Sequence, residues 1–196
     1  YGGGELSSVD TVTVAISGGT LGELMAANAL TMKGNVFGGS LGLIDTGYTT
    51  YSNVKDSWVA VSDSALIVGS VYGGGENGRV MNNTNVAVTG GTIGRPLTLA
   101  ERKTDEYVQF ERLYTGNVYG GGSGASIVRY DNEVPVLYDS AGTVYGNTNV
   151  TVSDSAVVRH NVYGGGNMAS VGKFTANKIT GIASYTSGGL AKVTIS

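Results

Sequence analysis

Five segments of the chain alternate between apolar and polar residues with a period of two, and Thr84-Asn85-Val86-Ala87-Val88-Thr89 is representative. In an extended strand this period places every second side chain on one face, so the β-branched residues of each segment face a core. The pattern predicts inward side chains at Val14 and Ile16, Val59 and Val61, Val86 and Val88, Val150 and Val152, and Val193 and Ile195. It predicts outward side chains at Ala15, Ala60, Ala87, Thr151 and Thr194.

A second motif, Asn-Val-Tyr-Gly-Gly-Gly, alternates with these segments. Its copies and variants span residues 1–4, 35–40, 70–75, 117–122 and 161–166. The spacing is uneven, since 27 residues separate Val59 from Val86 and 64 separate Val86 from Val150. The additional residues lie at only two places, before the Asn-Val-Tyr sequence and after its glycines. Insertions confined to fixed corners are typical of stacked coils, because loops leave the stack there.

These two motifs predict an all-β fold, a parallel β-solenoid of the right-handed β-helix type, with about five irregular coils and insertions at two corners. Each strand is expected to pair with its equivalent in the next coil, about 4.8 Å along the axis, so that identical residues stack. Residues 1–196 are expected to form a single domain. Because the chain opens inside one motif and closes inside the other, we interpret it as a segment of a longer protein.

The insertions differ in composition. The apolar, Ala-rich stretch from Leu21 to Met32 is expected to form a turn or two of helix. The segment from Arg95 to Thr115 holds eight of the 27 charged residues and predicts a projecting hairpin or loop, with an additional strand at residues 107–110. Two further insertions span Arg129 to Tyr145 and Met168 to Gly189.

Composition and charge exclude several classes of partner and cofactor. The formal charge is −3, whereas nucleic-acid binding usually requires a basic patch, so no nucleic-acid partner is expected. The chain has no cysteine, which excludes disulfides and thiolate metal sites, and no cofactor is predicted. It also has no run of 18 apolar residues, so no membrane insertion is expected within this segment. A cysteine-free, Thr- and Asn-rich composition fits an exported bacterial protein.

The alternation of Asn117-Val118-Tyr119-Gly120-Gly121-Gly122 with Thr148-Asn149-Val150-Thr151-Val152 resembles the repeat-rich, adhesin-like parallel β-helix proteins of gut bacteria, especially Bacteroidales. The resemblance extends over essentially the full length. It implies a cell-surface or secreted, extracellular protein. It implies no catalytic residue at any position of this sequence.

The sequence offers little for catalysis. His160 is the only histidine, and we interpret it as a corner residue without chemistry, so neither a metal site nor a catalytic triad is predicted. Two carboxylate pairs could serve a glycosidase, which needs carboxyls about 5–9.5 Å apart. They are Asp63 with Asp154, which also fit ordinary Asp-Ser turns, and Asp131 with Asp139. Arg79, Arg129 and Arg159 could supply a basic group to a lyase.

An aromatic column is the more specific candidate for binding. The residues that precede the glycines, Tyr1, Phe37, Tyr72, Tyr119 and Tyr163, are expected to stack. If the preceding valines point inward, these rings point outward and could hold sugar rings or a partner protein. Ligand binding is therefore predicted at Tyr72, Tyr119 and Tyr163, with Tyr130 and Tyr138 from an insertion. The alternative is a purely structural stack. Asn35, Asn117 and Asn161 are expected to form an amide ladder along the same edge.

The sequence favours a non-catalytic, adhesin-like solenoid that presents a binding face or acts as a spacer. Its expected partner is a glycan or a host or matrix protein. One alternative is a carbohydrate-active β-helix enzyme, a polysaccharide lyase or hydrolase. The other is an ice-binding solenoid, which would require a flat face with regular rows of outward threonines, and the alanines among the outward positions do not supply them.

Overall fold

The computed structural model describes residues 1–24, 32–44, 49–50, 52–103, 108–109, 115–124, 128–131, 134–137, 140–176 and 183–196. Regular structure in these residues is almost entirely β. The exceptions are the 3₁₀ helix η1, Glu101–Lys103, and the two helical residues 108–109. The predicted strand at residues 107–110 is therefore wrong where the structure describes it, at Val108 and Gln109.

The largest sheet collects the five period-two segments in sequence order and in parallel. Its strands follow the order β1 (Val9–Ile16), β8 (Asn53–Val61), β12 (Thr84–Val88), β17 (Thr148–Val152) and β22 (Ala191–Ile195), and β11 (Arg79–Val80) also pairs with β8. Equivalent residues are partners across the whole sheet, as Val59 is to Val86 and Val86 is to Val150. The predicted stacking of identical residues in register is confirmed.

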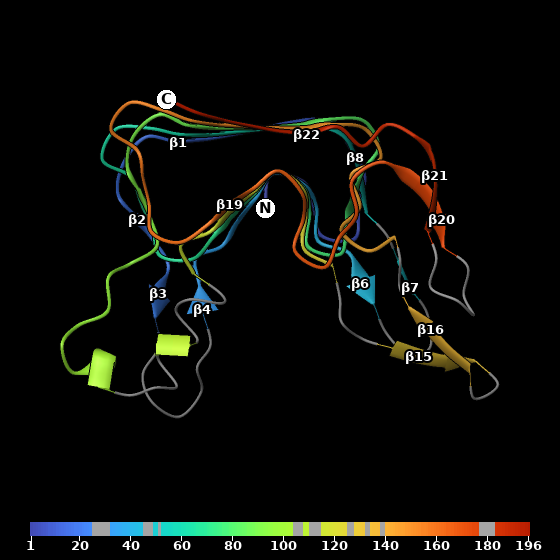
Figure 1. Cartoon of the computed structure of the whole chain (residues 1–196), viewed down its shortest axis with the longest axis horizontal. Coiled ribbons are helices and arrows are strands. Elements are labelled where there is room, and N and C mark those ends of the chain that lie inside the picture. Colours follow the sequence, from blue (N-terminus) through green and yellow to red (C-terminus); the bar gives the residue numbers. More distant parts are fainter. Residues whose placement is uncertain are drawn as a thin grey trace.

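Two smaller parallel sheets complete each repeat unit (Figure 1). One contains the Val-Tyr dipeptides, in the order β19 (Val162–Tyr163), β14 (Val118–Tyr119), β10 (Val71–Tyr72) and β5 (Val36–Phe37). The other has the order β18 (Val157–Val158), β13 (Thr92–Ile93), β9 (Leu66–Ile67) and β2 (Thr20–Leu21). Each unit thus runs from the large sheet through both small ones and back, an arrangement compatible with a β-solenoid.

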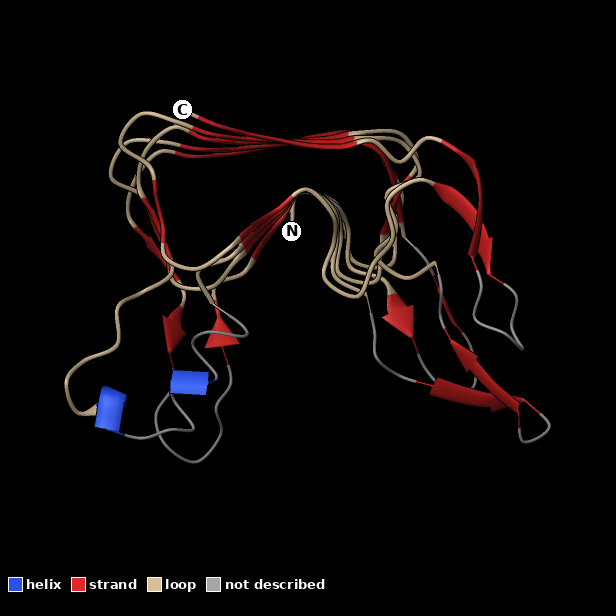
Figure 2. Cartoon of the chain, in the orientation of Figure 1, coloured by secondary structure: helices blue, strands red, loops and turns tan. Residues whose placement is uncertain are grey.

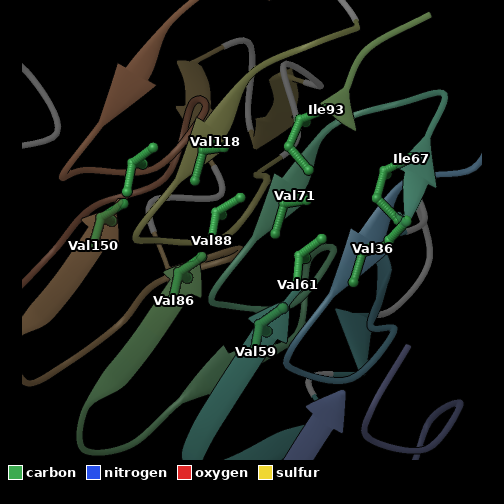
Figure 3. Close-up of a cluster of buried hydrophobic side chains, with 12 residues drawn as sticks. Val36, Val59, Val61, Ile67, Val71, Val86, Val88, Ile93, Val118 and Val150 are labelled. Carbon is green, nitrogen blue, oxygen red and sulfur yellow. The ribbon is translucent and has the colours of Figure 1, made fainter. Parts of the chain in front are cut away.

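Valine and isoleucine side chains from all three sheets fill the space between them (Figure 3). Val59, Val61, Val86, Val88 and Val150 are 2% exposed or less. Val36, Val71 and Val118 contribute to the same cluster from the sheet that carries the tyrosines. The inward orientation predicted from period two is confirmed for the inner strands of the large sheet.

The last strand keeps the predicted register, but its inward positions are not covered. Val193 and Ile195 of β22 are 39% and 68% exposed, although they pair in register with Val150 and Val152. The reason is positional, because β22 is the terminal strand in the sheet order and has a strand neighbour only at β17.

The insertions project away from the large sheet in two groups (Figure 2). Four of them contain short antiparallel pairs: β3 (Glu23–Leu24) with β4 (Met32–Lys33), β6 (Leu43–Ile44) with β7 (Thr49–Thr50), β15 (Val128–Asp131) with β16 (Val134–Leu137), and β20 (Lys173–Ala176) with β21 (Ala183–Ser187). The turn or two of helix expected from Leu21 to Met32 is not found where the structure describes that segment, since Leu24 and Met32 belong to strands, and residues 25–31 lie outside the described residues.

Candidate functional site

The aromatic residues form one continuous stack. Successive ring centroids from Tyr1 through Phe37, Tyr72 and Tyr119 to Tyr163 are 5.0, 4.6, 4.8 and 4.9 Å apart, and neighbouring planes are within 14° of parallel. The inner three rings form a cluster separate from the valine core, so they lie on the opposite side of their strands from it. The predicted column therefore exists, on the side away from the core.

Burial restricts what this column can contact. Phe37, Tyr72 and Tyr119 are only 4–7% exposed, whereas Tyr163 is 44% exposed. Burial raises the pKa of the Tyr72 hydroxyl, and the neighbouring Tyr119 raises it further, while hydrogen bonds with Asn167 and Ser70 lower it. The Tyr1 hydroxyl donates to the Glu76 carboxylate. The inner rings thus present little surface to a ligand. Ligand binding there remains a prediction.

Of the two other tyrosines predicted to bind ligand, Tyr130 belongs to β15, and only its backbone is described. Tyr138 lies outside the described residues, as does Asp139. Asp131 is the last residue of β15.

The asparagine ladder is present, with a serine in one position. Asn161 donates to the Asn117 side-chain oxygen through its backbone N–H at 3.2 Å and its amide at 3.0 Å. The backbone N–H of Asn117 donates to the Ser70 hydroxyl, and that of Ser70 donates to the Asn35 side-chain oxygen. These hydrogen bonds run along the stack and join one repeat unit to the next.

The paired aspartates of the repeats have a turn geometry. Asp63 and Asp154 have φ angles of 53° and 58°, a left-handed conformation that Asp tolerates in turns. Each accepts a 2.9 Å hydrogen bond from the preceding serine hydroxyl. Among the described residues, no three His, Asp or Glu side chains are grouped so as to hold a metal ion.

A cavity of about 220 Å³ lies where the insertion between residues 94 and 116 meets a later repeat unit. Its described lining consists of Leu97, Arg102, Val108, Arg159 and His160, which we call the cationic pocket. The first three residues come from the insertion, and the last two follow β18 at the corner before the Asn161 motif. Arginine and histidine donors thus converge beside two apolar side chains.

Two glycines that flank the insertion, Gly94 and Gly116, leave room for the pocket. A Cβ atom at Gly116 would lie 2.8 Å from the His160 ring and 3.2 Å from the Arg159 Cβ, and one at Gly94 would lie 3.2 Å from the Arg159 Cδ. The backbone N–H groups of Arg159 and His160 donate to the carbonyls of Ile93 and Gly116. Gly94 and Gly116, which flank the insertion, therefore allow both basic side chains to pack against them, while the backbone hydrogen bonds to Ile93 and Gly116 fix the backbone of Arg159 and His160.

Local hydrogen bonds shape the insertion beyond its neck. The Thr98 N–H donates to the Glu101 carboxylate at 2.7 Å, and the Glu101 N–H donates to the Thr98 hydroxyl at 3.3 Å, which is a capping box at the start of η1. Arg95 donates to both carboxylate oxygens of Glu101, at 3.2 and 2.8 Å. These hydrogen bonds from Arg95 and Thr98 lower the pKa of Glu101 to about 2.

The same local structure orients the pocket residues. Leu97 is buried. The Arg102 Nε–H donates to the Leu97 carbonyl at 3.2 Å, so the guanidinium is fixed beside the apolar wall. The described lining contains no carboxylate, and Glu101 is paired with Arg95 outside it. The described lining of the pocket thus combines two arginines and a histidine with the apolar side chains of Leu97 and Val108.

Sequence reasoning did not find this pocket, because it treated His160 as a corner residue without chemistry. A signal was available in the repeats. The position before the motif asparagine or serine is glycine at Gly34, Gly69 and Gly116, and only His160 carries a side chain there. The contribution of Arg102 and Leu97 could not be foreseen, since it depends on how the insertion folds back.

Comparison of the chain with known protein families, curated proteins and solved structures finds no match. No helix in the described part of the chain is long and apolar enough to cross a membrane.

Proposed function

We propose that the chain is a right-handed β-helix of about five irregular coils that acts as a non-catalytic, adhesin-like binding module at a bacterial surface or in secreted form. Its ligand is a glycan or a host or matrix protein. In this proposal the stacked strands are a rigid scaffold, and the insertions at its corners make the contacts.

The cationic pocket is the observation that supports this proposal best. It is built where an insertion meets the corner of a later repeat unit, so it uses residues that the valine core does not need. Binding residues on loops that a rigid scaffold positions are a general feature of recognition proteins. The exposed ring of Tyr163, at the end of the aromatic column, adds a second contact surface.

The repeats themselves supply the variant that tests the proposal. Thr92 and Ile93 pair with Leu66 and Ile67, and the latter pair runs directly into Val68-Gly69-Ser70 without an insertion. A Cβ atom on Gly94 would be only 2.6 Å from the Gly116 Cα, so the two glycines are already neighbours. Deletion of residues 95–115 therefore joins Gly94 to Gly116 as the uninterrupted repeat does.

A glycan array and a panel of immobilised matrix proteins should reveal binding by the wild-type chain that this deletion reduces. Its far-ultraviolet circular dichroism and thermal unfolding should remain those of the wild type. Tyr163→Ala is the matched surface variant, and its effect reports the contribution of the aromatic column. Undiminished binding by both variants would contradict the proposal. Release of oligosaccharides from a polysaccharide, abolished by Asp131→Asn or Asp139→Asn, would favour the alternative enzyme.

A further inference from the structure

We infer that the outer face of the large sheet binds an extended, uncharged glycan, such as a β-1,4-linked glucan chain, through Trp58. The inference goes beyond the proposed function, because this surface belongs to the stacked strands and not to the insertions or the aromatic column. Trp58 is the only tryptophan of the chain. Its neighbours on β8, Ser57 and Val59, are buried, whereas Trp58 is 41% exposed, so its ring lies on the side of the sheet away from the valine core.

The face around Trp58 consists of two columns of in-register residues, and the described parts of the insertions project away from it (Figure 2). The first column contains Thr13, Trp58, Asn85, Asn149 and Lys192, and the second contains Ala15, Ala60, Ala87, Thr151 and Thr194. Because alanine side chains rise little above the backbone, the second column leaves a shallow floor beside the indole ring. Adjacent strands are about 4.7–4.9 Å apart, so the Asn85 amide lies within reach of a sugar ring that stacks on Trp58.

The composition of the two columns favours a neutral sugar over a protein or an acidic glycan. An indole ring supplies a large apolar surface for the C–H face of a pyranose and an N–H donor for a hydroxyl, and an amide such as Asn85 both donates and accepts. Among the residues of these columns only Lys192 is charged, three strands from Trp58, so the face has no charge complementary to an acidic ligand at its centre. A stable protein interface buries about 800 Å² per partner around an apolar core, and Trp58 is the only large apolar side chain in the two columns.

The shape of the sheet favours an extended chain of sugars. In-register pairing makes the floor of alanines continuous from β1 through β8 to β12. A β-1,4-linked glucan is a flat ribbon that can lie along such a surface, whereas an α-1,4-linked glucan coils and leaves it after few contacts. The strand also fixes the backbone of Trp58 before any ligand arrives, which lowers the entropic cost of binding.

Isothermal titration with cellohexaose tests the ligand class, with maltohexaose and tetragalacturonate as the comparison ligands. We expect cellohexaose to bind with an affinity that added salt does not change, because the contacts at Trp58 involve no charge. The coiled maltohexaose and the acidic tetragalacturonate should bind clearly more weakly. Since Trp58 supplies all the tryptophan fluorescence, cellohexaose should also shift the emission to shorter wavelength and protect it from acrylamide quenching.

Variants on the same face separate the contacts. Trp58→Ala should weaken the binding of cellohexaose by about tenfold or more, as the loss of a central aromatic contact does, and Trp58→Tyr should restore part of it. Asn85→Ala should weaken binding by about three- to tenfold through the loss of a hydrogen bond. Val157→Ala is the matched control and should bind like the wild type, because it truncates a 47% exposed apolar side chain on a different sheet. Far-ultraviolet circular dichroism should be the same for all four variants, since none of these side chains belongs to the valine core.

Wild-type affinity in Trp58→Ala, equal binding of maltohexaose, a preference for tetragalacturonate or an absence of binding by cellohexaose would each overturn the inference. The 95–115 deletion leaves the large sheet intact and should bind cellohexaose like the wild type. The proposed function is decided separately, by the ligands whose binding that deletion reduces.

Discussion

The glycine corners of the stack support a prediction whose size follows from the structure. Gly121 and Gly165 are the middle glycines of successive Tyr-Gly-Gly-Gly motifs. A Cβ atom at Gly121 would lie 2.8 Å from both the Cα and the N of Gly166, in the next repeat unit, whereas one at Gly165 would have no atom within 4 Å. Gly121→Ala should therefore destabilise the fold, and Gly165→Ala should not.

The cost of Gly121→Ala can be estimated from the local geometry. Restoring a 3.4 Å contact requires the two repeat units to separate by about 0.6 Å. The hydrogen bond from the Gly121 N–H to the Gly165 carbonyl, now 3.0 Å, would then lengthen to about 3.6 Å and be lost. Overpacking costs about 1–3 kcal/mol and the hydrogen bond about 1 kcal/mol, which gives a free energy of unfolding lower by about 2–4 kcal/mol.

Thermal unfolding followed by far-ultraviolet circular dichroism measures the difference. A chain of this size loses about 2–4 °C of melting temperature per kcal/mol, so Gly121→Ala should melt about 4–16 °C below the wild type. Gly165→Ala should melt at or slightly above the wild type, because alanine restricts the unfolded chain and meets no clash. Equal melting temperatures for the two variants would refute the idea that close approach between repeat units requires these glycines.

Three further predictions concern the core, the ladder and the insertion. Val88→Asp buries an unpaired charge at a position that is 0% exposed, so it should lower the free energy of unfolding by about 4 kcal/mol or more. Thr151→Asp, on the outer face of the same sheet, should lower it by under about 1 kcal/mol. Equal urea midpoints for the two variants would contradict the assigned faces. Asn117→Ala should lower the free energy of unfolding by about 2–3 kcal/mol in the same assay, because two donors of Asn161 lose their acceptor. An unchanged urea midpoint would show that the asparagine ladder is dispensable. The pKa of Glu101 is lowered to about 2, from about 4.3 in an unfolded chain, so its support of the insertion is complete above about pH 4.3 and is lost as the pH falls through about 2. The Thr98 amide NMR signal should titrate with that low midpoint and lose the transition in Glu101→Gln, whereas a midpoint near 4.3 would exclude the hydrogen bond.

The sequence predicted the parallel stacking because one physical rule covers most of the chain. When a period-two segment such as Val86-Ala87-Val88 recurs between identical glycine corners, in-register stacking buries every valine at once, and a shift by one residue would expose them all. The same regularity predicted the aromatic column and the asparagine ladder. It also predicted where the insertions leave the stack.

The sequence did not predict features that depend on what lies next to a residue in space. Period two marks Val193 and Ile195 as inward, yet they are exposed because their strand is the last in its sheet. Alternation placed the tyrosines on the outer side, but it could not show that Tyr72 and Tyr119 are covered there. The cationic pocket joins segments more than 40 residues apart through contacts that no periodicity encodes.

The division between stack and insertions explains how one chain can combine uniform repeats with a specific site. The core positions are fixed by neighbours above and below, so a substitution such as one at Val88 affects several units together. The insertion between Gly94 and Gly116 leaves and re-enters the stack at adjacent positions, so its length and sequence can change without altering the inter-strand register. Arg159 and His160 nevertheless place part of the pocket on a later repeat unit, because their backbone N–H groups donate to the carbonyls of Ile93 and Gly116 in the preceding unit. The pocket therefore exists only when the two repeat units are stacked, although its lining residues contribute nothing to the valine core.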